Sequence, residues 1–267
     1  MLHGDHKALV DAALSVCVRY GLAVAGGYAV KAHGLVERPS EDIDFATGAA
    51  APIEEIVAAL DAAYLTAGFD VQVLDAEGRK GHLLVTFPLG GTYRVDVLKE
   101  PLNHPVVWMD FGPVIALADT VALKMGALHD RALPRDVLDA HGAAARFTRA
   151  ELIAACRGAL DEDFSLETLR DQLAFAATYP DEAFSRYGAG QELITEVKAW
   201  ALSWSTEISL DIAESESWSM TRITSTEHLP NAANDVCRRP SAKMSKGSPS
   251  FVRRKLDGRS RVWSTSP

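Results

Sequence analysis

The sequence predicts an α+β protein in which a mixed sheet with flanking helices is followed by a helical domain and a disordered, basic tail. Three observations lead to this prediction. Short strand-like runs dominate residues 22–98, helical periodicity dominates residues 115–205, and serine with short polar runs replaces both beyond about residue 210. We therefore expect three regions, covering residues 1–110, 111–210 and 211–267.

Composition limits the class of protein. With 267 residues, 48% of them hydrophobic, the chain can bury a full core. The net charge is −9, yet residues 211–267 hold 10 Lys or Arg against 6 Asp or Glu, so the remainder is strongly acidic. This balance argues against a broad basic face, and an RNA partner must be held by a local patch or by the tail.

The sequence predicts no membrane-spanning helix, no signal peptide and no disulfide framework. No apolar run reaches about 18 residues, the length that a membrane-spanning helix needs, and the first residues do not read as a signal peptide. The three cysteines are far apart and belong to no paired motif. We expect a cytoplasmic protein with reduced thiols and no membrane partner.

The first elements of the chain lead to a glycine turn. A helix over about residues 6–20 is expected to end at Gly21, and an apolar strand over residues 22–25 ends abruptly at Gly26 and Gly27. Glycine lets the backbone turn sharply and approach a bound group closely. The amides that open the following helix have no intrahelical partner, so they favour an anion such as phosphate.

Two carboxylates follow on the next predicted strand. Side chains alternate along a strand, so Asp42 and Asp44 point to one face while Ile43 and Phe45 point to the other. Carboxylates this close repel each other unless a cation lies between them, and hard oxygen ligands favour Mg²⁺ or Mn²⁺. A phosphate cradle beside a divalent cation site indicates nucleotide chemistry.

The sheet is expected to continue after a helix that begins at Pro52 and ends at Gly68. Residues 69–74, 82–88 and 92–98 read as strands, the last two joined in a hairpin across residues 89–91. In the last strand Asp96 shares a face with Arg94, so it is the candidate third carboxylate. An isolated strand acid is more often a solvated surface group, and only the preceding pair favours a role in the site.

The order of these features resembles that of the DNA polymerase beta-like nucleotidyltransferases. Within that superfamily, Gly-Gly-Tyr-Ala, His-Gly and Arg-Pro-Ser-Glu-Asp-Ile-Asp are similar to the AbiEii/AbiGii type, the toxin half of bacterial toxin–antitoxin pairs. The resemblance covers roughly the first half of the chain. It implies a nucleotidyltransferase-like sheet, a nucleoside triphosphate substrate, an RNA acceptor such as a tRNA end, and an antitoxin protein as partner.

The resemblance also assigns roles to residues. Asp42, Asp44 and Asp96 become the catalytic residues and the ligands of Mg²⁺ or Mn²⁺. The expected nucleotide-binding residues come from the glycine turn, the segment before the acidic strand and two later helices: Gly26, Gly27, Tyr28, Arg38, Ser40, Lys124, Arg135 and Asp136. Many nucleotidyltransferases have serine after the glycine. With Tyr28 in that place, only its backbone amide or a longer reach could contact phosphate.

The second half reads as helices. Lys124 lies in the middle of the first, and Pro134 opens the next, where Arg135 precedes Asp136 and Asp139. Lys124 could hold a phosphate as a point charge and Arg135 could add a forked contact. For the two acids we favour an orienting role over metal ligation, although surface ion pairs would give the same pattern.

Two other functions remain open. A small-molecule nucleotidyltransferase of the antibiotic-resistance kind would use the same acids with a dedicated acceptor pocket. A catalytically weak nucleotide-binding module could keep the fold and lose turnover, and Tyr28 is the feature that points to it. A nicotinamide-binding fold is disfavoured because Gly-x-Gly-x-x-Gly is absent.

Overall fold

A seven-stranded mixed sheet forms the centre of the N-terminal half. The computed structural model of the protein describes residues 4–225, and for residues 216–225 the backbone alone. The strand order is β3-β4-β5-β2-β1-β7-β6. The strands are β1 (Ala23–Val24), β2 (Ile43–Thr47), β3 (Asp70–Glu77), β4 (Lys80–Thr86), β5 (Thr92–Lys99), β6 (Val107–Met109) and β7 (Gly112–Val114).

Both strand directions occur in this sheet, which confirms the predicted α+β class. The β3-β4-β5 meander is antiparallel, and β5 then pairs parallel with β2. The two-residue strand β1 pairs antiparallel with β2 and parallel with β7. Since β1 runs directly into the glycine turn, the turn lies beside the centre of the sheet.

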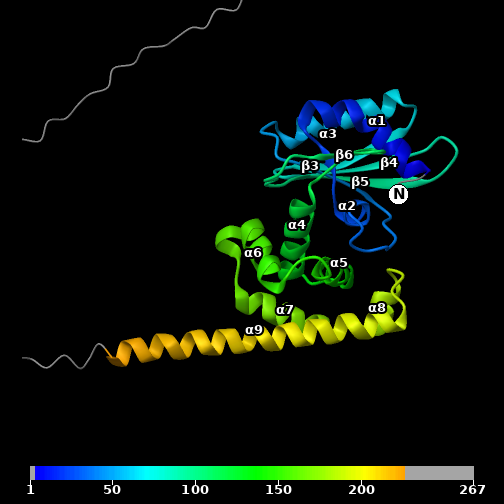
Figure 1. The fold of residues 1–267 in the computed structure, drawn as a ribbon. Coiled ribbons are helices and arrows are strands. Elements are labelled where there is room, and N and C mark those ends of the chain that lie inside the picture. The colour runs from blue at the N-terminus through cyan, green and yellow to red at the C-terminus, as the bar shows by residue number, and fades with distance from the viewer. Residues whose placement is uncertain (1–3, 226–267) are drawn as a thin grey trace, which may run out of the picture. The chain divides into compact units, whose positions relative to one another are not determined.

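The two faces of the sheet differ in character. Helices α1 (Asp5–Tyr20) and α3 (Ile53–Thr66) cover one face, and α2 (Gly26–Ala32) lies on the other (Figure 1). Alternate residues of β2 and β5 are fully buried in the core that includes α1 and α3: Ile43, Phe45, Val95 and Val97. The residues between them, including the acids, therefore face the α2 side.

A second apolar cluster fills the helical half. Its helices are α4 (Leu117–Asp130), α5 (Pro134–Ala144), α6 (Arg149–Leu160), α7 (Leu166–Ala176), α8 (Asp181–Ser185) and α9 (Gln191–Ser225), with a 3₁₀ turn at Asp161–Asp163. Side chains cap two of these helices: Thr148 and Glu151 form a capping box on α6, and Ser165 accepts from the amide of Thr168 at the start of α7. Trp204 and Phe184 are the largest side chains of this cluster that are fully buried.

The disordered tail predicted for residues 211–267 is wrong at its start. Helix α9 continues to Ser225, so the sequence from 211 to 225 is helical and the predicted tail does not begin at 211. Ile208 is buried and Ile212 packs against the same cluster, so the helix keeps apolar contacts past residue 210. The rest of that predicted tail, residues 226–267, lies outside the described residues. Within residues 4–225, no helix is long and apolar enough to cross a membrane.

Candidate active site

The glycine turn and the acidic strand are in close contact. Gly26 has a φ of +56°, and a Cβ built there would lie 1.8 Å from Oδ2 of Asp44. A Cβ on Gly27 would lie 2.6 Å from Oγ of Ser40. Any side chain at either position would displace one of these groups, and at Gly26 it would also strain the backbone. The two glycines therefore allow the acidic strand to approach the start of α2.

The three predicted carboxylates lie together on one face of the sheet. Asp44 of β2 is paired directly with Asp96 of β5 in the parallel register, and Asp42 precedes β2 by one residue. Burial, followed by the charge of Asp96, raises the pKa of Asp42. Burial also raises the pKa of Asp44, and Lys124 only partly offsets this effect. Both shifts mark an anionic site with too little compensating positive charge.

Asp96 has partners that the other two carboxylates lack. Its Oδ1 accepts from Nε of Arg94 at 2.7 Å and lies 2.8 Å from Nδ1 of His82. His82 was not among the predicted site residues. Counting back from the predicted three-residue turn would place residue 84 opposite residue 96. In the structure β4 ends at Thr86 and β5 begins at Thr92, so the connection is longer and His82 is the residue opposite Asp96. Asp96 is thus held by its own hairpin.

The donor set fits a divalent cation in part. Within residues 4–225, the carboxylates of Asp42 and Asp44 make no side-chain hydrogen bond or ion pair, although both are partly buried. Orphaned carboxylate oxygens of this kind suit a hard cation. Across the same residues, no group of three or more His, Cys, Asp or Glu is arranged to hold a metal ion. Asp42 and Asp44 are therefore the fitting ligands, and Asp96 is already engaged.

A buried ion cluster surrounds Asp139, which is on α5. Asp139 is fully buried and accepts two hydrogen bonds from Arg38, at 2.6 and 2.7 Å. Nζ of Lys124 is 3.0 Å from the same carboxylate. Burial acts to raise the pKa of Asp139, but Lys124 and Arg38 outweigh it and hold that pKa below its usual value. This cluster joins the segment before β2 to α4 and α5.

The two remaining predicted residues of α5, Asp136 and Arg135, differ in their surroundings. Asp136 is fully buried, and its carboxylate accepts from the guanidinium of Arg131 at 2.9 and 3.2 Å. Arg135 is only partly buried and has no ion pair within residues 4–225. Its charge lowers the pKa of both Asp42 and Asp44, against the larger effect of burial. Arg135 thus lies near the carboxylates with its charge uncompensated, whereas Asp136 is tied to Arg131.

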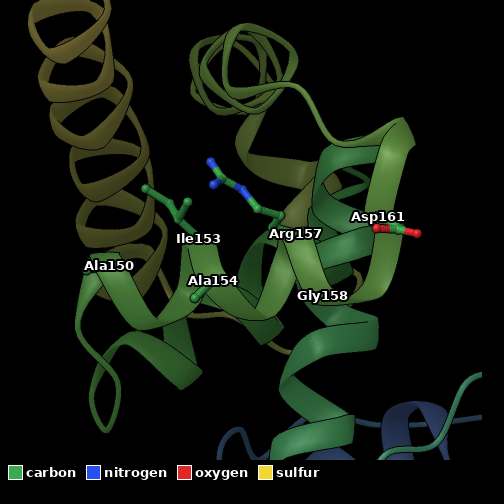
Figure 2. A pocket seen from close by; sticks show the side chains of 6 residues that line it. All are labelled: Ala150, Ile153, Ala154, Arg157, Gly158 and Asp161. Atoms are coloured by element: carbon green, nitrogen blue, oxygen red, sulfur yellow. The ribbon is translucent and has the colours of Figure 1, made fainter. Parts of the chain in front are cut away.

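An open hollow on the helical half is a separate feature. It measures about 590 Å³ and is lined by side chains of α6 and the turn that follows: Ala150, Ile153, Ala154, Arg157, Gly158 and Asp161 (Figure 2). The guanidinium of Arg157 lies over the ring of Phe164, at 5.0 Å from its centroid. None of the predicted site residues lines this hollow.

Comparison with known proteins identifies the class. A family model described as nucleotidyl transferase AbiEii toxin, type IV toxin–antitoxin system, matches residues 18–186. The match spans the glycine turn, the three carboxylates and the Asp139 cluster. The protein belongs to the AbiEii nucleotidyltransferase toxin family. No curated protein matches the chain.

Structural comparison aligns the chain with solved structures at low sequence identity. JHP933 from Helicobacter pylori is 18% identical, with a TM-score of 0.46, and the alignment covers 82% of this chain and 97% of that one. MenT4, a nucleotidyltransferase toxin of Mycobacterium tuberculosis, is 20% identical, with a TM-score of 0.43, over 74% of this chain and 91% of its own.

Proposed function

We propose that this toxin-family nucleotidyltransferase moves a nucleoside monophosphate from a nucleoside triphosphate to an acceptor hydroxyl, with Mg²⁺ or Mn²⁺ as cofactor. The observation that carries the proposal is the pair Asp42 and Asp44, two partly buried carboxylates with raised pKa values and no side-chain hydrogen bond or ion pair among the described residues. Asp42 and Asp44 would hold the cation, which when bound would neutralise the pair and supply charge stabilisation to the phosphate oxygens and the leaving pyrophosphate.

The chain's own residues would bind and align the triphosphate. The backbone amides of Gly26, Gly27 and Tyr28 open α2 beside Asp44, where an anion is favoured. Arg135 offers a forked guanidinium with no ion pair in the described part of the chain. Lys124 is 13% exposed, so it can present one face of its ammonium to phosphate while it keeps its bond to Asp139.

In this proposal the other predicted nucleotide-binding residues position the site and do not contact the nucleotide. Arg38 and Asp136 are buried in ion pairs, and Ser40 lies in contact range of Gly27. They hold residues 36–41, the segment before β2, and α5 in place. The acceptor oxygen attacks the α-phosphorus, the bond to the β-phosphate oxygen breaks, and pyrophosphate leaves while the hydroxyl proton passes to a base or to water.

Family membership supports a proposal for the acceptor and for the partner. We propose an RNA acceptor, a tRNA end, and an antitoxin protein that opposes the activity in the cell. The toxin family and its nucleotidyltransferase class support this proposal. The acidic composition of the folded half agrees with an acceptor held locally rather than along a broad basic face.

The experiment determines which molecule receives the label from each labelled nucleoside triphosphate. Purified protein is incubated with Mg²⁺, total RNA and a small-molecule extract, and the products are separated by size. Label in tRNA supports the proposal, whereas label only in small molecules favours an antibiotic-type enzyme. Triphosphate binding without transfer under any condition favours a binding module. Asp44→Asn serves as the inactive control and Asp171→Asn, in an exposed ion pair on α7, as the active one.

A further inference from the structure

The segment that delivers Asp42 to the site has no strand partner of its own. Strand β2 begins at Ile43, and residues 36–41 before it form no helix or strand. Asp44 is fixed by the ladder between β2 and β5, but Asp42 lies outside that ladder. Side chains from elsewhere must therefore set the position of Asp42.

Two side chains reach the two carbonyls that directly precede Asp42. The hydroxyl of Tyr28, on α2, donates to the carbonyl of Ser40 at 3.1 Å. Nε2 of His6, on α1, lies 3.0 Å from the carbonyl of Glu41, to which it can donate. The two side chains also contact each other, since the Tyr28 oxygen is 2.6 Å from Nδ1 of His6. Either tautomer of a neutral imidazole keeps two of these three bonds.

Ring packing fixes both side chains. The His6 ring lies 5.2 Å from the ring of Tyr28 and 4.9 Å, edge-on, from that of Tyr93. The Tyr93 hydroxyl donates to Asp5 at 2.6 Å. The start of α1 is thus held by these contacts. Burial raises the pKa of Tyr28, so its hydroxyl keeps its proton near neutral pH.

We infer that Tyr28 and His6 are positioning residues that set the distance of Asp42 from Asp44 and thereby the affinity of the site for a divalent cation. This inference rests on the proposed function. It also accounts for tyrosine after the glycine turn. A serine at position 28 would be too short to reach the Ser40 carbonyl from α2, whereas the tyrosine ring spans that gap. Gly27 takes part because a side chain there would push Ser40 away.

The test compares four variants of the full chain. Tyr28→Phe keeps the ring and removes the hydroxyl. Tyr93→Phe is the matched control, because it removes a hydroxyl of the same cluster that bonds to Asp5 and not to the segment. His6→Ala removes the bond to Glu41, and His6→Gln retains a donor near the place of Nε2. Mn²⁺ affinity without nucleotide, hydrogen exchange of residues 36–44 and melting temperature are measured for each.

Loss of one hydrogen bond is expected to weaken Mn²⁺ binding about five-fold in Tyr28→Phe and in His6→Ala. Hydrogen exchange in residues 36–44 should rise in the same two variants. Tyr93→Phe should leave both quantities at the wild-type level, and His6→Gln should recover most of the affinity that His6→Ala loses. In the transfer assay, kcat should fall in Tyr28→Phe while KM for the triphosphate stays near its wild-type value.

Several results would overturn the inference. Unchanged exchange in Tyr28→Phe and His6→Ala would mean that these side chains do not hold the segment. Raised exchange with unchanged Mn²⁺ affinity would mean that the segment does not govern the site. An equal loss of Mn²⁺ affinity in Tyr93→Phe would mean that the packing of this aromatic cluster, and not the hydrogen bonds of Tyr28 and His6 to the segment, determines the affinity. A wild-type protein that binds Mn²⁺ but transfers no nucleotide would contradict the proposed function alone, since exchange and Mn²⁺ affinity still decide the roles of Tyr28 and His6.

Discussion

Replacing Asp139 by asparagine tests the ion cluster that joins the acidic segment to α4 and α5. The substitution keeps the shape of the side chain and removes its charge. Arg38, whose side chain is 5% exposed, and Lys124, 13% exposed, would then lose their shared counter-ion. Breaking a buried pair of this kind costs about 3–5 kcal/mol, because the remaining charges stay buried without compensation.

The expected change is large enough to measure directly. A domain of 150–250 residues loses about 2–4 °C of melting temperature per kcal/mol, so Asp139→Asn should melt roughly 10 °C below the wild type. Thermal melting followed by circular dichroism and urea unfolding would both report it. The control is Asp171→Asn, because Asp171 is 69% exposed and pairs with Arg170 at the surface, where the melting temperature should hardly change.

Acid titration provides a second measure of the same cluster. The pKa of Asp139 is lower in the folded protein than its usual value of about 3.9. A carboxylate with a depressed folded pKa contributes stability above its unfolded pKa and loses it as pH falls through the folded pKa. The gap between wild type and Asp139→Asn should therefore be full above about pH 4 and close below it. Equal melting at pH 7, or a gap that persists in acid, would refute the reasoning.

Three further predictions concern the carboxylates and the turn. Asp42→Asn or Asp44→Asn should lower nucleotidyl transfer by orders of magnitude, while metal-free melting stays level or rises because a repelling charge is removed. Full activity in either variant would exclude that residue as a metal ligand. Gly26→Ala should lower melting temperature and Mg²⁺ affinity together, because its Cβ would overlap Asp44. Gly158→Ala, in α6 with nothing within 4 Å, is the matched control and should melt at or slightly above wild type. The raised pKa values of Asp42 and Asp44 mean that calorimetry should show Mg²⁺ affinity falling, on acidification, at a higher pH than ordinary aspartates would require. Affinity that declines only below pH 4 would contradict this.

Local pattern was enough to predict the carboxylate pair of the site. The alternation of side chains put Asp42 and Asp44 on one face, and this inference uses only neighbouring residues. Asp96 was a candidate because of the preceding pair and the family resemblance, and the parallel pairing of β5 with β2 that brings it beside Asp44 was not predicted. The glycine turn was equally readable, because its two glycines interrupt an apolar run.

The ion cluster around Asp139 could not be predicted from local sequence pattern. Arg38 and Asp139 are separated by 101 residues, and no periodicity in the sequence links them. Their pairing depends on how α5 packs against the segment before β2. The sequence likewise gives no sign that His6 reaches Glu41, since that contact depends on the placement of α1 against the sheet. The length of α9 was missed because the apolar period weakens after residue 210, where Ile212 still packs against the helical cluster.

The long separation between Arg38 and Asp139 also sets an order of events during synthesis of the chain. Protein synthesis proceeds at about 5–20 residues per second, so roughly 5–20 seconds pass between the appearance of Asp44 and that of Asp139. During this interval the growing chain can form β2 and its glycine turn, but the buried counter-ion that holds Arg38 and Lys124 does not yet exist. A chain that stops short of α5 carries the acidic cluster without Arg135, and the enzyme is complete only after more than half of its length has been made.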